Sequence, residues 1–307
     1  MKKTFLLLVT ILLLGVINVK AEEEYNIIID ENNNFTLTDS SNNQITDNTI
    51  AKYEENALTL GEGKYFNQIK VKSDATITSN DKGVYIKELT TKEGNTNVLA
   101  NVTINNLKVR EDDTYICKII IGGNLIIDDS EINSKSSHSI DGYSYVTNAK
   151  IKATSYYANK NDSEGYGLKI INSEIETGVL CPFLSGLYIK DSTLDISSTL
   201  YSYGKVYIDG ATIDVGISNT STGSRITFQG RNNGEEIIKN STIKAKNSIE
   251  NSTNDLTIEN SIIEIGGISP NDSLLKISNS TLKVKNGLSY MRAIIEDSNL
   301  EVGYIGL

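Results

Sequence analysis

The sequence is poor in the residues that usually carry catalysis or crosslinks. It contains no tryptophan, one histidine, four arginines and two cysteines in 307 residues. Two cysteines are too few for the framework of a disulfide-stapled secreted domain. The single histidine, His138, and the scattered arginines form no constellation typical of pectin hydrolysis or lyase chemistry. The absence of tryptophan removes the commonest platform for stacking sugar rings.

The chain has only one long apolar run, at its start. Lys2 and Lys3 precede apolar residues from Phe5 to Ile17, and the segment ends on small residues around Ala21. This is the pattern of a cleaved signal peptide, and it is too short for a stable membrane span. We expect residues 1–21 to be removed and the protein to be secreted or placed at the cell surface, without membrane insertion.

Acidic side chains outnumber basic ones. The chain has 39 Asp and Glu against 29 Lys and Arg, a formal net charge of −10. A surface of this sign repels nucleic acid and anionic lipid. It remains compatible with a neutral polysaccharide, or with an acidic one that is bridged by cations.

A short phrase recurs along most of the chain. In LKISNSTLKV, apolar residues alternate with polar ones on both sides of an Asn-Ser pair, and most copies follow one another at 19 or 20 residues. The first residue of each pair is Asn, Asp or Gly, which tolerate the left-handed backbone of a sharp corner. These corner residues are Asp129, Asn148, Asn172, Asp191, Gly210, Asn240, Asn260, Asn279 and Asp297.

The alternation has the period of strands, and nowhere does it show the period of a helix. A third apolar position recurs about nine residues after the corner, which predicts three strands in each coil. The sequence therefore predicts an all-β chain, a right-handed parallel β-helix with about 20 residues per coil. A leucine-rich repeat has a similar period but needs an LxxLxLxxN line that is absent here.

The repeat does not cover the whole mature chain. Residues 22–100 alternate without the Asn-Ser corner and are expected to form a strand-rich cap and irregular first coils, while residues 101–307 form the repeats. No cap is evident near Leu307, so the chain is either complete with a poorly shielded end or a fragment of a longer surface protein. Cys117 and Cys181 lie about three coils apart, too far for a disulfide, and are expected to be buried thiols.

The stretch KYEENALTLGEGKYFNQIKVKSDATITSN, followed by GNLIIDDSEI, GLKIINSEI and DLTIENSIIEI, resembles a group of secreted Gram-positive bacterial repeat proteins. These are the carbohydrate-binding, polysaccharide-lyase-like β-helix proteins of gut and cellulolytic bacteria. The resemblance covers most of the mature chain and implies a calcium-containing β-helix that binds plant or cell-wall polysaccharide. The usual corner phrases of that group are represented only by SHSIDG near His138, so its calcium ligands have no matching positions here.

Outward residues at equal positions in successive coils should stack into stripes about 4.8 Å apart. Four residues after the corner, three consecutive coils carry Glu176, Asp195 and Asp214. Three close carboxylates favour a hard cation such as calcium between them. A solvated face on which Glu and Lys alternate is the simpler interpretation.

Three residues before the corner, the coils carry Tyr145, Lys169, Tyr188 and Tyr207. Tyrosine rings at coil spacing would make a flat surface on which sugar rings can stack, although tyrosine also suits any half-exposed sheet. A longer coil carries an insertion around SYYANKNDSEGYG, and insertions in solenoids often form binding loops. We expect it to add the tyrosines Tyr156, Tyr157 and Tyr166 to the surface.

These features favour a non-catalytic, carbohydrate-binding or adhesive protein with a plant or bacterial glycan as its partner. A calcium-dependent polysaccharide lyase, with Lys152 or Lys244 as base, and an inert structural stalk are the alternatives.

Overall fold

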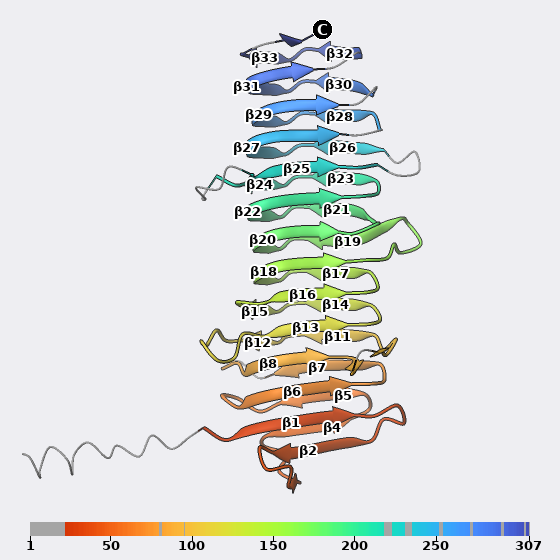
Figure 1. The fold of residues 1–307 in the computed structure, drawn as a ribbon, viewed down its shortest axis with the longest axis vertical. Coiled ribbons are helices and arrows are strands. Elements are labelled where there is room, and N and C mark those ends of the chain that lie inside the picture. The colour runs from red at the N-terminus through yellow and green to blue at the C-terminus, as the bar shows by residue number, and fades with distance from the viewer. Residues whose placement is uncertain are drawn as a thin grey trace, which may run out of the picture.

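The computed structural model describes residues 22–79, 82–94, 96–217, 223–230, 235–251, 254–270, 273–289, 292–303 and 305–306. The expected signal peptide, residues 1–21, lies outside the described residues. Within them the chain contains no helix and forms a right-handed parallel β-helix of about 11 turns (Figure 1). The predicted fold class is confirmed. No segment of the described residues is a helix long and apolar enough to cross a membrane.

Two long sheets run the length of the rod (Figure 1). One has 13 strands, mostly of four or five residues. It consists of β4 (Ala51–Glu54), β5 (Ala57–Leu60), β7 (Ala75–Ser79), β11 (Val102–Asn105), β14 (Leu125–Asp128), β17 (Ser144–Thr147), β19 (Tyr166–Ile171), β21 (Gly186–Lys190), β23 (Val206–Asp209), β26 (Glu236–Lys239), β28 (Leu256–Glu259), β30 (Leu274–Ser278) and β32 (Arg292–Glu296).

The other sheet has 19 strands. It consists of β1 (Glu24–Ile29), β2 (Phe35–Asp39), β3 (Gln44–Ile45), β6 (Tyr65–Val71), β8 (Tyr85–Thr90), β12 (Lys108–Val109), β13 (Lys118–Ile121), β15 (Glu131–Asn133), β16 (Ser137–Ile140), β18 (Lys150–Ala158), β20 (Glu174–Pro182), β22 (Thr193–Ser202), β24 (Thr212–Val215), β25 (Arg225–Phe228), β27 (Thr242–Asn251), β29 (Ile262–Pro270), β31 (Thr281–Ser289), β33 (Asn299–Val302) and β34 (Ile305–Gly306). A separate hairpin joins β9 (Lys92–Glu93) and β10 (Thr96–Asn97).

The third strand predicted for each coil is often joined to the second. In β18, β20, β22, β27, β29 and β31 the two segments form one strand of nine or ten residues. The register shifts by a residue between Thr177 and Val179, and similar shifts occur in later coils. A bulge can bend a strand without ending it. In these coils one bent strand of the 19-stranded sheet therefore takes the place of two separate strands that the sequence predicted.

The bulge also moves one predicted core residue. Leu180, and not Cys181, pairs with Leu200 in the core column. The coil of β20 has one residue fewer at its bulge than the coil of β22, so counting from the corner misplaces Cys181 by one position. Both cysteines are nevertheless free and buried, as predicted. Burial raises the pKa of Cys117 to about 12 and that of Cys181 to about 11.

The corner residues adopt the backbone that the sequence predicts. All eight Asn and Asp corners from Asp129 to Asp297 have φ between 46° and 51°, and Gly210 has φ 66°. The serine that follows most corners has a second role. Its hydroxyl donates to the carbonyl two residues earlier, as from Ser261 to Glu259, and accepts the N–H of the residue that follows the corner in the preceding coil, as from Ser241. The Asn-Ser pair thus turns the chain and links one coil to the next.

The core consists of the inward columns that the alternation predicts. Leu275, Ile277, Leu282 and Val284 of the LKISNSTLKV phrase are all buried. Antiparallel pairing joins β1 to β2, β2 to β3 and β4 to β5 at the N-terminal end. Parallel pairing already begins with β5 and β6, so regular stacking starts earlier than the irregular segment 22–100 suggested.

Candidate functional site

The predicted column of outward residues is present on the 13-stranded sheet. Tyr145 pairs with Lys169, Lys169 with Tyr188, and Tyr188 with Tyr207. The rings of Tyr188 and Tyr207 stack with their centroids 5.0 Å apart and their planes at 10°. The stacking is confirmed residue by residue, whereas sugar binding stays a prediction.

Two further rings extend this column. Tyr143 stacks on Tyr145 at 4.8 Å, and Tyr166 meets Tyr188 edge-on at 5.3 Å and 74°. Tyr166 enters from the longer coil, as the insertion predicted. We call this group the tyrosine surface, which consists of Tyr143, Tyr145, Tyr166, Tyr188 and Tyr207 with the lysines Lys169, Lys205 and Lys239.

The three lysines lie against the rings. The Nζ atom of Lys205 is 4.2 Å from the centroid of Tyr166, that of Lys169 is 4.9 Å from Tyr145, and that of Lys239 is 5.1 Å from Tyr207. An ammonium group this close to a ring is attracted by its π electrons. The tyrosine surface therefore combines aromatic rings with ammonium groups that lie over them.

A carboxylate holds the loop between β18 and β19 onto this surface. The Asp162 side chain accepts hydrogen bonds from the Tyr145 hydroxyl at 2.6 Å and from backbone N–H groups at Glu164 and Tyr166. It also pairs with Lys169 at 2.7 Å. Burial alone would raise the pKa of Asp162, but these partners lower it to about 2. The loop is thus anchored by a charged group that stays ionised at neutral pH.

Two of the predicted sugar-binding tyrosines do not belong to this surface. Tyr156 is buried, 1% exposed, and cannot contact a ligand in the surrounding solvent. Its hydroxyl shares a 2.7 Å hydrogen bond with Ser144, and its ring lies edge-on to His138 at 5.8 Å. Tyr157 is part of β18 in the other sheet. The prediction that the insertion begins at these tyrosines was wrong, because strand alternation continues to Ala158 before the loop starts.

His138 is a core residue and lies nine residues after the corner Asp129, where the third apolar position of a coil recurs. It pairs with Tyr156 of the next coil and is completely buried. Among the described residues, neither ring nitrogen has a hydrogen-bond partner. Burial lowers the pKa of His138 to about 4, so the ring is neutral over the physiological range. It lies too deep in the core to meet a ligand at the surface.

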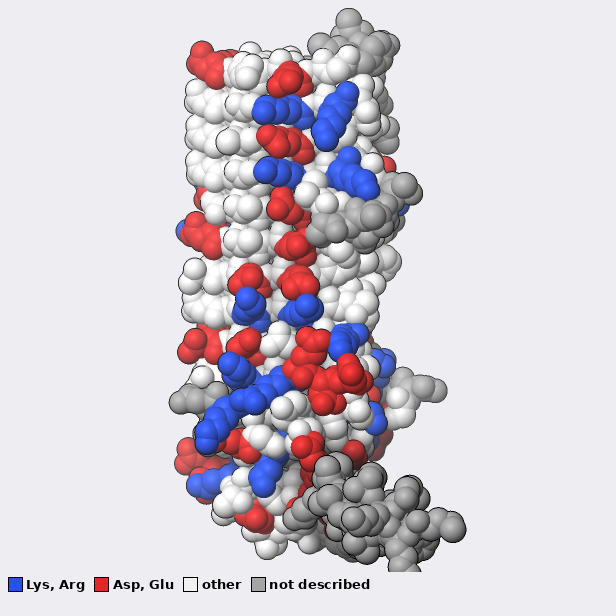
Figure 2. All heavy atoms as spheres, turned by 90° about the vertical axis from the view of Figure 1, so that its left-hand side faces the viewer, with Lys and Arg blue, Asp and Glu red and all other residues white. Residues whose placement is uncertain are grey.

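The charged stripe predicted on the 19-stranded sheet is also present. Glu176 pairs with Asp195 and Asp195 with Asp214, and acidic and basic residues then alternate from Lys244 to Glu301. Figure 2 shows this stripe of red and blue side chains along the rod. Salt bridges join Lys152 to Glu176 at 3.0 Å and Lys283 to Glu264 at 3.4 Å. The stripe is thus partly neutralised by its own lysines.

A shallow groove of about 350 Å³ follows part of this stripe and is bordered by Lys135, Lys152, Glu176 and Asp195. No group of three or more His, Cys, Asp or Glu side chains in the described part of the chain is arranged to hold a metal ion. Calcium at Glu176, Asp195 and Asp214 stays a prediction.

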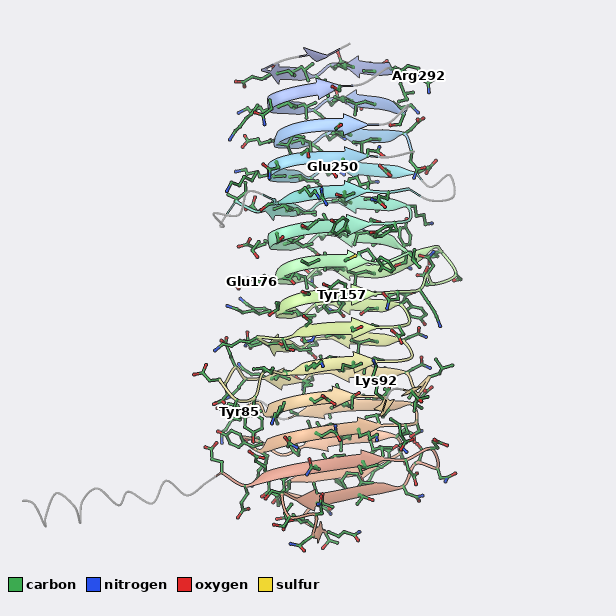
Figure 3. All side chains as sticks on the ribbon, viewed as in Figure 1. Tyr85, Lys92, Tyr157, Glu176, Glu250 and Arg292 are labelled. Atoms are coloured by element: carbon green, nitrogen blue, oxygen red, sulfur yellow. The ribbon has the colours of Figure 1, made fainter. Side chains whose placement is uncertain are left out.

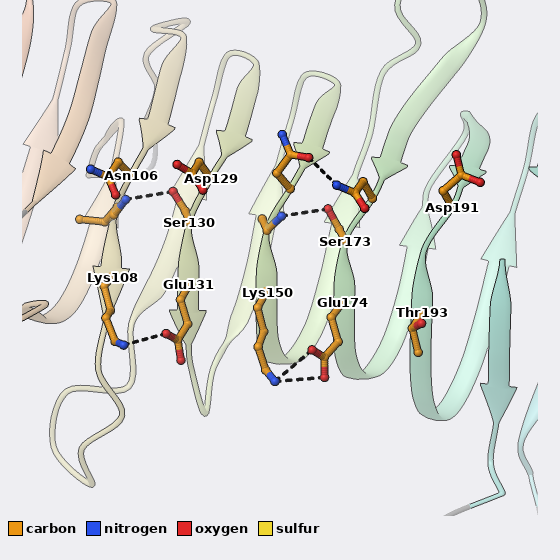
Figure 4. A pocket seen from close by; sticks show the side chains of 14 residues that line it. Asn106, Lys108, Asp129, Ser130, Glu131, Lys150, Ser173, Glu174, Asp191 and Thr193 are labelled. Atoms are coloured by element: carbon orange, nitrogen blue, oxygen red, sulfur yellow. Dashed lines mark hydrogen bonds and ion pairs between the residues drawn. The ribbon is translucent and has the colours of Figure 1, made fainter. Parts of the chain in front are cut away.

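The sequence did not point to a second groove of about 600 Å³, which follows the corners (Figure 4). Its walls consist of corner residues and of alternating charges two residues further on. Lys108 pairs with Glu131 and Lys150 with Glu174, both at 3.0 Å, while the Asn172 amide donates to Asn148 at 2.7 Å. These groups bind one another along the stack, so the groove follows from the repeat itself.

Comparison with known proteins adds nothing to this geometry, because no protein-family model, no curated protein and no solved structure matches the chain significantly. The resemblance to polysaccharide-lyase-like proteins therefore extends to the β-helix fold alone.

Proposed function

We propose that this chain is an exported, non-catalytic protein that binds polysaccharide through the tyrosine surface. The observation that carries the proposal is the pair of parallel rings at Tyr188 and Tyr207, 5.0 Å apart. Half-exposed rings in such a stack offer their edges, and the parts of their faces that the stack leaves uncovered, to the C–H groups of sugars while hydroxyl groups remain hydrated. The neighbouring lysines supply donors for sugar hydroxyl or carboxylate groups, and this combination supports a glycan ligand in an acidic protein.

The test is binding of residues 22–307 to a panel of plant and bacterial polysaccharides. The double variant Tyr188→Ala, Tyr207→Ala should bind about tenfold more weakly or worse, because each ring contributes about 0.5–1.5 kcal/mol. The matched control is Tyr188→Phe, Tyr207→Phe, which keeps both rings and should retain binding. Equal binding by the alanine variant and the native protein would refute the proposal.

We propose secondarily that calcium binds at Glu176, Asp195 and Asp214. The support is that these three carboxylates lie on adjacent strands. Each binding measurement is repeated with calcium and with chelator. If retention of an acidic glycan needs calcium and fails in Asp195→Ala, the stripe takes part in binding. Release of unsaturated sugars in the same experiment would favour the lyase, and no binding under any condition would favour the inert stalk.

A further inference from the structure

A second group of aromatic side chains lies outside the tyrosine surface. The ring of Phe183 meets that of Tyr203 at 5.0 Å and 65°, and Tyr203 stacks with Tyr201 at 6.2 Å and 21°. Phe183 is 45% exposed, although a large aromatic side chain usually prefers the core. We call Phe183, Tyr201, Tyr203 and Tyr157 the second aromatic surface.

Tyr157 belongs to the second aromatic surface through the strand register. It pairs with Cys181, which directly follows Leu180, and Leu180 pairs with Leu200. Tyr201 directly follows Leu200, so Tyr157 and Tyr201 lie two coils apart with the buried Cys181 between them. Figure 3 shows Tyr157 on the long strands that face the viewer, in the same sheet as Glu250.

Charged groups border these rings. The Arg225 Nη2 atom donates to the Tyr201 hydroxyl at 2.9 Å, and the guanidinium lies 5.8 Å from the centre of the Tyr201 ring. Its Nη1 atom is 3.5 Å from Glu250, which also accepts a hydrogen bond from Thr227. The Arg225 side chain is nearly half exposed. As on the tyrosine surface, flat rings thus adjoin a cation and hydrogen-bonding groups that a sugar can use.

The backbone at the adjacent corner holds apolar side chains outward. Leu184 follows Phe183 and has φ 61°, a left-handed conformation that a leucine rarely adopts. Both side chains are exposed. Strain of this kind persists where the surrounding structure imposes it, and it is concentrated at functional sites. The corner therefore presents Phe183 beside Tyr203 at an energetic cost.

The two aromatic surfaces face different directions. The tyrosine surface lies on β17, β19, β21 and β23 of the 13-stranded sheet, with Tyr143 directly before β17. In the second aromatic surface, Tyr157 and Tyr201 lie on β18 and β22 of the 19-stranded sheet, while Phe183 and Tyr203 directly follow β20 and β22 at the corner. Figure 1 shows these sheets on opposite sides of the rod, joined by corners. Because the corner between them is convex, one stiff polysaccharide chain cannot lie flat on both.

We propose that the second aromatic surface is a separate sugar-binding site, so that each chain binds two glycan strands and crosslinks them. This inference rests on the proposed function, since it assigns the same ligand class to both surfaces. The exposed charges of Arg225 and Glu250 favour a glycan over a protein partner, whose interface would bury them.

The test measures binding stoichiometry by calorimetry, with oligogalacturonate, xylohexaose and cellohexaose as probes. The native chain should bind two molecules of one probe. Tyr201→Ala, Tyr203→Ala should bind one, as should Tyr188→Ala, Tyr207→Ala, and the quadruple variant none. Phe183→Ala changes an exposed side chain and should weaken the second site without affecting the fold, while Tyr201→Phe, Tyr203→Phe should keep two sites.

Crosslinking gives a second readout. Native protein retained on an insoluble polysaccharide should capture a labelled soluble oligosaccharide. Either double alanine variant should capture at least about tenfold less of it. If the native chain binds one probe molecule and the Tyr201→Ala, Tyr203→Ala variant binds it equally well, the second site is overturned but the proposed function stands. No binding of any probe overturns both. A change of oligomeric state in the Tyr201 and Tyr203 variant, without loss of sugar binding, identifies a protein contact instead.

Discussion

At the scale of single residues, hydrogen bonding by the serine after most corners explains why the repeat contains Asn-Ser. The hydroxyls of Ser173, Ser192, Ser241, Ser261 and Ser280 form a ladder in which each accepts a backbone N–H from the coil before it. Alanine replaces the serine at Ala149 and Ala211, and each of these residues still donates its own N–H to the next serine. The ladder therefore satisfies buried N–H groups that the sheets leave unpaired.

Replacing one rung should destabilise the protein measurably. In Ser261→Ala the buried N–H of Ser241 loses its acceptor, and an unsatisfied buried donor costs about 1–3 kcal/mol. The free energy of unfolding from urea denaturation checks this. Ser269→Ala, at an exposed position of β29, the strand that follows Ser261, is the control and should change it little. Equal effects of the two substitutions would contradict the role of the ladder.

A buried carboxyl group should make stability depend on pH. Glu236 occupies the inward column between Val206 and Leu256, and burial raises its pKa to about 9 despite a hydrogen bond from Asn254. Unfolding lets this group ionise at its usual pKa near 4.5. Between these two values the folded state holds the extra proton, so stability falls as pH rises, by about 1.4 kcal/mol per pH unit at most.

The substitution Glu236→Gln removes this titration. Its free energy of unfolding should exceed that of the native chain more at pH 8.5 than at pH 7. His138 titrates only below about pH 6.5 in either state, since burial lowers its folded pKa to about 4. The titration of His138 therefore does not affect the comparison between pH 7 and pH 8.5. Glu235→Gln, at the exposed neighbouring position, should leave the pH dependence unchanged; the same slope in the Glu236 variant would contradict the assignment.

At the scale of elements, the loop between β18 and β19 connects the sheets and completes the tyrosine surface. It brings Tyr166 beside Tyr188 and leaves the Asp162 side chain only 4% exposed. Its four interactions with Asp162 come from both the loop and the adjacent strands. The Asp162 carboxylate thus ties the loop to the tyrosine surface.

Removing that carboxylate should release the loop. Asp162→Ala eliminates the ion pair with Lys169 and two backbone hydrogen bonds, so amide hydrogen exchange in residues 159–166 should accelerate by at least about tenfold. Sugar binding should weaken as well, because Tyr166 loses its position. Asp162→Asn keeps an oxygen acceptor for the backbone and should show a smaller acceleration. Unchanged exchange in the alanine variant would show that other contacts hold the loop.

At the scale of the whole molecule, stacking converts a short repeat into extended surfaces. Each strand pairs with its equivalents in the coils before and after it, so residues about 20 positions apart become neighbours along the rod. Figure 2 shows the result for charge, and the two aromatic surfaces show it for tyrosine. A binding surface several coils long then needs only one suitable residue from each coil.

The sequence alone determined the fold and the order of residues within each column. Inward alternation and the left-handed corners are local properties, and every coil must satisfy them in the same way. For this reason Tyr188 and Tyr207, or Glu176 and Asp195, could be placed side by side by counting from the corner.

The tertiary structure determined the features that counting residues from the corner cannot predict. Bulges change the number of residues between corner and column, so Leu180 enters the core in place of Cys181. The point at which a strand ends depends on packing against the next coil, which draws Tyr156 into the core and leaves Tyr157 on the other sheet. The bend of the corners likewise decides that Tyr203 contacts both Phe183 and Tyr201. Tyr201 in turn accepts the hydrogen bond from Arg225. These contacts arise between coils, and the linear pattern of any one coil does not specify them.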